Sequence, residues 1–274
     1  MKNEPLTELN TLESRCLLAT NCAHAGTPSC TRLCPHYNAV MGSTGRGGRA
    51  GNANLPADYA LLTLKTSPVR TNQTKVYERL SKYVSTFTRQ FEASDARIKS
   101  VYLWSESPGT GKTTTAACLL NEFLAQYYVG SLKRGETPIS RPCYFLDVNE
   151  WQTLYNEFNR PRVPEEIAEK ASVKYYRSME YAKYAKYTVL DDVGVREASD
   201  GFRGDLHSVI NYRVTNGLPT CYTSNLPIKY EGEKDTYDPY DLYDIFGEKR
   251  LVDRIRDQCI PLYFEGESKR GIRR

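Results

Sequence analysis

The most informative stretch of this sequence reads Ser105-Glu106-Ser107-Pro108-Gly109-Thr110-Gly111-Lys112-Thr113-Thr114. An apolar run at 101–104 precedes it and indicates a buried strand, and residues 114–128 place apolar side chains at helical spacing. A strand, a tight turn with glycines and a helix, in this order, form the context in which a loop binds nucleotide phosphates. The stretch therefore predicts a phosphate-binding loop, with a glycine-rich turn and an incidental lysine as the alternative.

The residue types in this loop match the chemistry of a nucleoside triphosphate. Gly109 and Gly111 allow the backbone to curl with its N–H groups inward, and the helix N-terminus adds partial positive charge. Lys112 would bind the β- and γ-phosphates, and the Thr113 hydroxyl would bind Mg²⁺. Glu106 departs from the full motif, which has glycine at this position. We expect ATP to contact Pro108, Gly109, Thr110, Gly111, Lys112, Thr113 and Thr114.

The composition is ordinary for a folded protein: 274 residues, of which 40% are hydrophobic and 26% charged, with a net charge of +4. This mild positive charge is compatible with nucleic acid. No apolar run approaches the roughly 18 residues of a membrane span, and the N-terminus lacks the apolar stretch of a secretory signal. We therefore expect a cytoplasmic protein without a membrane partner, whose eight cysteines are thiols or metal ligands rather than disulfides.

Four of the cysteines lie close together near the N-terminus, interleaved with two histidines in the pattern C-x5-C-x-H-x5-C-x3-C-x-H. Thiolate and imidazole ligands at this density are typical of a tetrahedral zinc site. Metal binding would supply folding free energy to a stretch with few large apolar residues, and free thiols are the alternative. We predict zinc binding by Cys16, Cys22, Cys30 and Cys34, with His24 and His36 as alternates or as partners of the ligands.

The composition also divides the chain into three parts. Residues 1–37 form the module rich in cysteine and histidine. Residues 38–57, rich in glycine, asparagine and alanine, predict a flexible linker. The remainder, 58–274, predicts an ATPase domain that includes an amphipathic helix at 74–91.

Apolar runs alternate with helical patterns through the ATPase part. Strands are predicted at 101–105, 142–148, 187–192, 220–223 and 260–264, and helices at 112–128, 149–158, 164–184 and 203–216. This alternation predicts an α/β fold, with helices on both faces of a parallel sheet.

Two carboxylates, Asp191 and Asp192, end the third of these strands. Such an end lies at the carboxyl edge of a parallel sheet, where the phosphate-binding loop also lies. Asp191 would hold Mg²⁺ through water or Thr113, and Asp192 would orient or deprotonate the attacking water. Asn225 follows the fourth strand and is a candidate partner of the γ-phosphate or of that water.

Four segments together resemble the AAA+ ATPases of the DnaC/DnaI type, the bacterial and phage loaders of the replicative helicase. They are P-G-T-G-K-T at 108–113, V-L-D-D-V-G at 189–194, T-S-N-L at 223–226 and G-E-K-R-L-V-D-R-I at 247–255. The resemblance implies a P-loop parallel sheet of five strands with no helical lid domain, preceded by a small zinc-binding module that binds the helicase. It covers about residues 95–274, whereas 1–57 match only in their clustered cysteines and histidines.

The same resemblance implies roles for individual residues. Asn225 would be the sensor-1 residue, and Arg254, or else Arg250, would be the arginine finger that reaches the ATP of a neighbouring subunit. Arg270 would contact ATP as sensor 2. A finger that acts in trans implies a homo-oligomer, as a ring or a spiral. Single-stranded DNA would contact Arg196, Arg203 and Lys229.

We therefore predict an ATPase that loads a replicative DnaB-type helicase onto single-stranded DNA in the initiation of replication. Its cofactors would be ATP, Mg²⁺ and Zn²⁺. Hydrolysis of ATP to ADP and phosphate is expected to be slow or stimulated by a partner. Two alternatives remain open: an IstB-type transposition helper ATPase, which shares this core, and a non-hydrolysing zinc adaptor or transcription regulator.

Overall fold

The computed structural model describes residues 11–92, 97–194, 198–229, 241–247 and 249–268. Its strands are β1 (Ser100–Trp104), β2 (Cys143–Asp147), β3 (Tyr187–Asp191), β4 (Thr220–Ser224) and β5 (Cys259–Tyr263). Its α-helices are α1 (Pro35–Met41), α2 (Gly48–Asn52), α3 (Thr74–Ser85), α4 (Lys112–Lys133), α5 (Val148–Asn159), α6 (Glu165–Tyr184), α7 (Asp200–Thr215), α8 (Leu242–Phe246) and α9 (Lys249–Gln258). Short 3-10 turns lie at Glu13–Arg15, Ala19–Asn21, Ala57–Tyr59, Arg70–Asn72 and Thr86–Phe91.

The five strands form one parallel sheet in the order β2-β3-β4-β1-β5, which confirms the predicted α/β class. β1 pairs with β4, where Val101 lies opposite Cys221, and with β5, where Leu103 lies opposite Leu262. Because all strands run in the same direction, their carboxyl ends meet at one edge of the sheet. The loop after β1 and the ends of β3 and β4 therefore lie close to one another.

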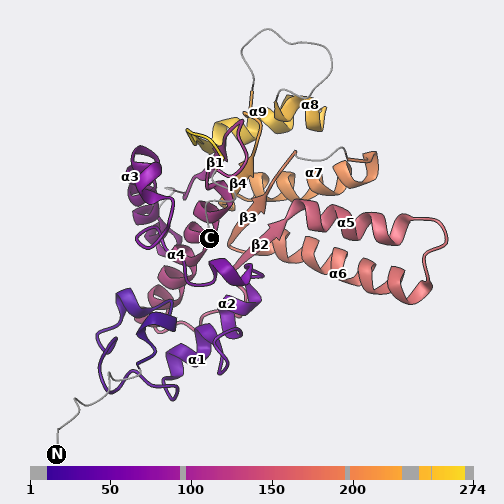
Figure 1. Cartoon of the computed structure of the whole chain (residues 1–274). Helices are drawn as coiled ribbons and strands as arrows, with labels where there is room; N and C mark the ends of the chain where they lie inside the picture. The colour runs from indigo at the N-terminus through magenta and orange to yellow at the C-terminus, as the bar shows by residue number, and fades with distance from the viewer. Residues whose placement is uncertain (1–10, 93–96, 195–197, 230–240, 248, 269–274) are drawn as a thin grey trace, which may run out of the picture.

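Helices cover both faces of this sheet (Figure 1). Side chains alternate along a strand, so Val101 and Leu103 enter the core that holds α3 and α4, whereas Tyr102 enters the core that holds α5, α6, α7 and α9. Burial on both faces explains why β1, β2 and β3 are nearly continuous apolar runs. The predicted helix at 74–91 is α3 followed by the 3-10 turn Thr86–Phe91.

A fully buried cation, Arg213 of α7, joins several elements at the amino edge of the sheet. Its guanidinium donates to the carbonyl oxygens of Ala182 and Ala185 at 2.8 Å, of Pro219 at 2.7 Å, and to Oγ1 of Thr220 at 2.8 Å. Burial lowers the pKa of this side chain to about 10. Carbonyl dipoles therefore take the place of a carboxylate partner.

The stretch 38–57, expected as a flexible linker, differs from that expectation in the structure. It contains α2, and Arg49 donates from Nε to the carbonyl oxygen of Ile139 at 2.9 Å. The carbonyl of Ala53 accepts the N–H of Phe145 on β2 at 2.8 Å, so this stretch covers the outer edge of the sheet. Side chains of this stretch pair with backbone groups about 90 residues further along: Arg49 with Ile139 and Asn52 with Ser140.

The N-terminal residues pack on the same side of the sheet as α4. Leu17, Leu18, Val40 and Met41 are buried in one core with Leu124 of α4. No helix in the described residues is both long enough and apolar enough to cross a membrane.

Candidate nucleotide-binding site

The phosphate-binding loop joins β1 to α4 at the carboxyl edge of the sheet. Gly109 and Gly111 have φ angles of 73° and 101°, in the left-handed region that favours glycine. A Cβ at Gly111 would lie 2.7 Å from Cγ1 of Val69, so the chain before α3 covers the loop closely. Gln73 adds to this cover, because its Nε2 donates to the carbonyl of Thr110 in the loop at 3.5 Å and also to that of Glu265 after β5 at 2.8 Å.

The glutamate that departs from the motif does not disturb this loop. Glu106 is exposed, and its backbone does not have a positive φ angle. The position therefore does not need the conformational freedom of glycine. The loop therefore forms with glutamate at this position.

Lys112 begins α4 and is 5% exposed. Its Nζ donates to the carbonyl oxygens of Ser107 at 3.1 Å and Ser105 at 3.5 Å. The loop thus holds the ammonium group at its own mouth. A bound polyphosphate would offer this cation oxygen atoms of opposite charge.

Asp191 ends β3 and is 4% exposed. Burial, the neighbouring charge of Asp192 and that of Asp147 raise its pKa to about 7, while hydrogen bonds with Thr223 and Thr113 act in the opposite direction. The contact with Thr113 joins the end of β3 to the phosphate-binding loop. A carboxylate beside a threonine hydroxyl is the oxygen donor pair that suits Mg²⁺, so the residues present fit this ion.

Thr223 of β4 contacts both aspartates. Its hydroxyl donates to Oδ1 of Asp191 at 2.7 Å and accepts the N–H of Asp192 at 2.8 Å. Asp192 has a φ of 58°, a left-handed conformation that asparagine and aspartate adopt more readily than most residues. Ser224 donates to the carbonyl of Val193 at 2.7 Å, so β4 fixes the whole turn after β3.

Sequence analysis assigned no role to the Thr223 hydroxyl. In the sequence, Thr223 and Ser224 stand directly before Asn225. Their contact with the aspartates can be predicted only once β4 is known to pair with β3. Asn225 itself is half-buried in the turn that follows β4, at the same edge as the loop. Its sensor role stays a prediction.

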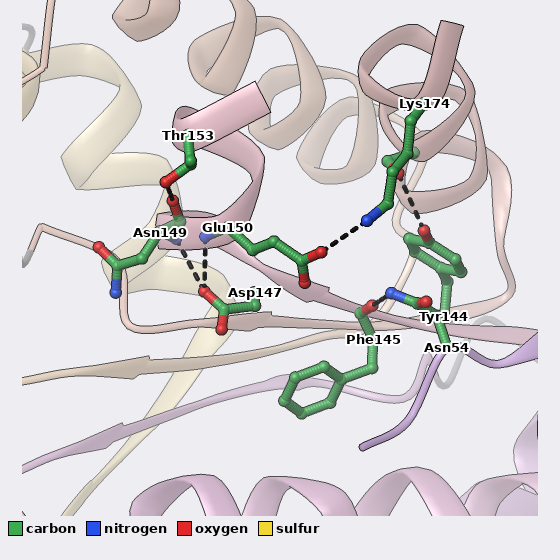
Figure 2. A network of polar contacts seen from close by, with 9 residues as sticks. Asn54, Tyr144, Phe145, Asp147, Asn149, Glu150, Thr153 and Lys174 are labelled. Atoms are coloured by element: carbon green, nitrogen blue, oxygen red, sulfur yellow. Dashed lines mark hydrogen bonds and ion pairs between the residues drawn. The ribbon is translucent and has the colours of Figure 1, made fainter. Parts of the chain in front are cut away.

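A polar network surrounds a third carboxylate at this edge (Figure 2). Asp147 lies opposite Asp191 in the pairing of β2 with β3, and its Oδ1 accepts the N–H groups of Asn149 at 2.9 Å and Glu150 at 3.0 Å. Glu150 in turn pairs with Lys174 of α6 at 2.6 Å. Asp147 therefore caps α5, a structural role that sequence analysis missed.

The arginines predicted to act between subunits lie on the exposed side of α9. Arg254 and Arg250 are both exposed, and Nη1 of Arg254 donates to Oδ1 of Asn211 on α7 at 2.8 Å. The predicted sensor-2 residue, Arg270, lies outside the described residues.

Of the residues expected to contact DNA, two lie in the described part of the chain. Arg203 pairs with Asp200 at the start of α7, and Lys229 is exposed. Arg196 lies outside the described residues. These contacts stay predictions.

The predicted zinc ligands share one cavity of about 600 Å³. Its lining includes Cys16, Cys22, Cys30, Cys34, His24 and His36. Burial, followed by the neighbouring thiols, raises the pKa of Cys16. Among the described residues, no three histidine, cysteine or acidic side chains are close enough together to hold a metal ion.

Two of these sulfur atoms accept backbone N–H groups. Cys16 accepts from Leu18, and Sγ of Cys34 accepts from Tyr37 at 3.5 Å. His36 is engaged elsewhere, because its Nδ1 lies 3.0 Å from the hydroxyl of Tyr128. Cysteine and histidine are ligand types that suit zinc. Zinc binding by these residues stays a prediction.

The loop after β1, the paired aspartates after β3 and the strand order β2-β3-β4-β1-β5 together form an AAA+-like α/β fold. No family model matches the chain, and no curated protein matches its sequence.

Solved structures match most of the chain. The crystal structure of DnaI has a TM-score of 0.50 and 21% identity, covering 80% of this chain and 99% of its own. The DnaC helicase loader has a TM-score of 0.48 and 20% identity, covering 77% and 100%. AMPPCP-bound DnaA from Aquifex aeolicus has a TM-score of 0.47 and 15% identity, covering 74% and 50%. The resemblance to DnaC/DnaI-type AAA+ proteins is thus confirmed at the level of the fold.

Proposed function

We propose that this chain is an ATP-dependent loader of a replicative DnaB-type helicase onto single-stranded DNA in replication initiation. The observation that carries the proposal is the contact of Asp191 with Thr113, because it unites both halves of an ATPase site in a fold shared with DnaI. The motif block at 247–255 adds exposed arginines, which suit contact with a neighbouring subunit.

The site residues divide the hydrolysis of ATP among them. Thr113 and Asp191 would hold Mg²⁺, which would neutralise charge on the phosphates when bound. Lys112 orients the same phosphates. Asp192 orients a water molecule and accepts its proton as the water oxygen bonds to the γ-phosphorus. The bond from that phosphorus to the bridging oxygen breaks, which leaves ADP and phosphate.

Two further contacts complete the cycle in the assembled protein. Asn225 binds the γ-phosphate or the attacking water and so reports which nucleotide is present. Arg254, or else Arg250, stabilises the developing charge from the adjacent subunit. ATP binding therefore assembles a ring or spiral, and hydrolysis releases the loader from the helicase and the DNA.

The N-terminal module, residues 1–37, serves as the helicase-binding part. Its four thiolates hold one zinc ion, whose binding would draw the cavity-lining cysteines together. Native mass spectrometry reports this directly, as a mass increase of one zinc that is lost in the variant Cys22→Ser.

The test of the whole proposal is native mass spectrometry of the chain with a DnaB-type helicase, with and without ATP. We expect a complex of defined stoichiometry that forms with ATP and is lost in Lys112→Ala. Lys170→Ala, which removes an exposed lysine of α6, is the matched control and should behave as the wild type. Binding to a transposase without binding to helicase, or equal binding by Lys112→Ala, would contradict the proposal.

A further inference from the structure

A second cavity, of about 840 Å³ and more polar than the one lined by the cysteines, lies between the N-terminal residues and the ATPase part. Arg15, Arg32 and Arg46 line it from three separate segments: a 3-10 turn, the turn before α1 and the loop between α1 and α2. Asp58 is the only acidic side chain among its described lining residues. The cavity therefore carries a local excess of positive charge, within the size range of about 300–1,000 Å³ that is common for ligand sites.

These three arginines have no partner in the described part of the chain. Each is exposed, and none of their guanidinium groups donates a hydrogen bond or forms an ion pair there. Arg49, in the same region, contrasts with them because its guanidinium donates to three backbone carbonyls. Arg49 is thus a structural cation, whereas Arg15, Arg32 and Arg46 leave their donors available to a ligand.

The loop between α1 and α2 adds uncharged hydrogen-bond donors to the lining of this cavity. Gly42 and Gly45 have φ angles of 71° and 77°, and the N–H of Gly45 donates to the carbonyl of Gly42 at 3.1 Å. A Cβ at Gly42 would lie 2.8 Å from the backbone of Gly47, so only glycine permits this tight loop. The exposed residues Ser43 and Thr44 line the cavity from its tip. Their hydroxyls and backbone N–H groups make no hydrogen bond within the described residues.

We propose that this cavity binds the phosphate groups of a ligand that carries several of them, either a free polyphosphate or the backbone of single-stranded nucleic acid. Arginine forks together with hydroxyl and amide donors are the groups that recognise phosphate oxygens. Tyr37 is the only aromatic side chain among the described lining residues and is 5% exposed. Bases therefore find no stacking partner, and the site reads phosphate rather than sequence. The site is separate from the phosphate-binding loop. A free polyphosphate goes beyond the proposed loading activity, whereas single-stranded nucleic acid rests on it and would add a further contact to the DNA.

The test uses the full chain with Lys112→Ala, which removes phosphate binding at the ATP site. Into this background we place the triple variant Arg15→Ala, Arg32→Ala, Arg46→Ala. The matched control removes three exposed cations of α3, with Lys75→Ala, Arg79→Ala and Lys82→Ala. Calorimetry measures binding of inorganic tripolyphosphate, and fluorescence anisotropy measures binding of a labelled oligothymidylate across a range of salt concentrations.

We expect the arginine triple variant to bind at least one of these probes about tenfold or more weakly, while the control changes little. If the oligonucleotide is the ligand, the negative slope of log affinity against log salt concentration should become shallower by about 2. Each of the three lost phosphate contacts contributes about 0.7 to that slope. Loss of tripolyphosphate binding alone identifies a free polyphosphate. Unchanged affinity of the arginine triple variant for both probes would overturn the proposal.

A second measurement uses the Lys112→Ala protein with all three arginines intact and so does not depend on the folding of the triple variant. Phenylglyoxal modifies exposed arginines, and peptide mass spectrometry reports each position. The bound probe should protect Arg15, Arg32 and Arg46 and leave Arg79 reactive. Equal modification with and without either probe would contradict phosphate binding at this cavity.

Discussion

The Thr223 hydroxyl donates to Oδ1 of Asp191 at 2.7 Å while it accepts the N–H of Asp192 at 2.8 Å. One fully buried side chain of β4 therefore fixes both carboxylates at the end of β3. The two aspartates have different surroundings, because Asp191 is buried and Asp192 is half-buried. This difference in burial suits Asp191 to metal binding and Asp192 to contact with water.

Replacement of Thr223 by valine should weaken both stability and hydrolysis. The change keeps the volume but leaves the Asp192 N–H without its acceptor, at a cost of about 1–3 kcal/mol in unfolding free energy. ATP hydrolysis should fall because the aspartates lose their orientation. Thr223→Ser keeps the hydroxyl and should retain activity. Wild-type stability and activity in the valine variant, with a loss in the serine variant, would show that the methyl group matters and the hydroxyl does not.

The variant Asp192→Asn should separate nucleotide binding from hydrolysis. Asparagine adopts the left-handed conformation at this position and keeps the backbone bond to Thr223, so the fold should be unchanged. Loss of the base should slow ATP hydrolysis by about 100-fold or more, with nucleotide affinity within a few-fold. Phosphate release and nucleotide titration measure the two effects. Hydrolysis near the wild-type rate would remove Asp192 from the proposed mechanism.

The arginine finger can be identified by mixing inactive subunits. Lys112→Ala subunits lack a working ATP site but still offer their α9 arginines to a neighbour. Mixed with Arg254→Ala subunits, they should restore part of the hydrolysis that each variant lacks alone. The same mixture with Arg250→Ala identifies that residue if Arg254→Ala proves active. The absence of any restored activity in both mixtures would argue against a site shared between subunits.

Arg213→Met should destabilise the fold without touching the ATP site. It removes the donors to the carbonyls of Ala182, Ala185 and Pro219, for an expected loss of at least about 3 kcal/mol. Thermal unfolding should then shift down by about 6 °C or more. Arg203→Met, on the more exposed side of the same helix, is the matched control and should change stability by no more than about 0.5 kcal/mol. A melting temperature equal to that of the control would show that the buried network is not stabilising.

Glu122 predicts a pH dependence of stability. Burial raises its pKa, although its Oε1 accepts the N–H of Leu64 at 3.3 Å. The folded state therefore binds this proton more tightly than the unfolded state, so stability falls as pH rises through the unfolded pKa and levels off above the folded pKa. Glu122→Gln should be more stable than the wild type at pH 7, and the difference should shrink towards pH 4. Urea unfolding at both pH values measures this, and a difference that grows in acid would contradict it.

Local sequence was enough to predict the five strands and the helices α3 to α7. The loop at 105–114 and the paired aspartates at 191–192 are contiguous motifs whose chemistry depends on immediate neighbours. The one irregularity, Glu106, needed the structure: its backbone does not adopt a positive φ, so glycine is not required.

Composition failed where contacts between distant residues decide the outcome. Residues 38–57 have the composition of a linker, yet Arg49 and Asn52 pair with backbone carbonyls at Ile139 and Ser140. A glycine-rich stretch has the same composition whether solvent or another segment satisfies its polar groups. Only the fold distinguishes the two, because it brings acceptors from about 90 residues away.

The sequence by itself therefore determined the class of site: a strand, a glycine-containing loop, a helix and a second strand that ends in two carboxylates. The tertiary structure decided which groups complete that site, since Thr223 reaches Asp191 only because β4 lies between β1 and β3. It also decided that three arginines from separate segments, without partners among the described residues, line one cavity. Periodicity and motif spacing act through neighbours along the chain, whereas strand order and the burial of charge depend on contacts between distant residues.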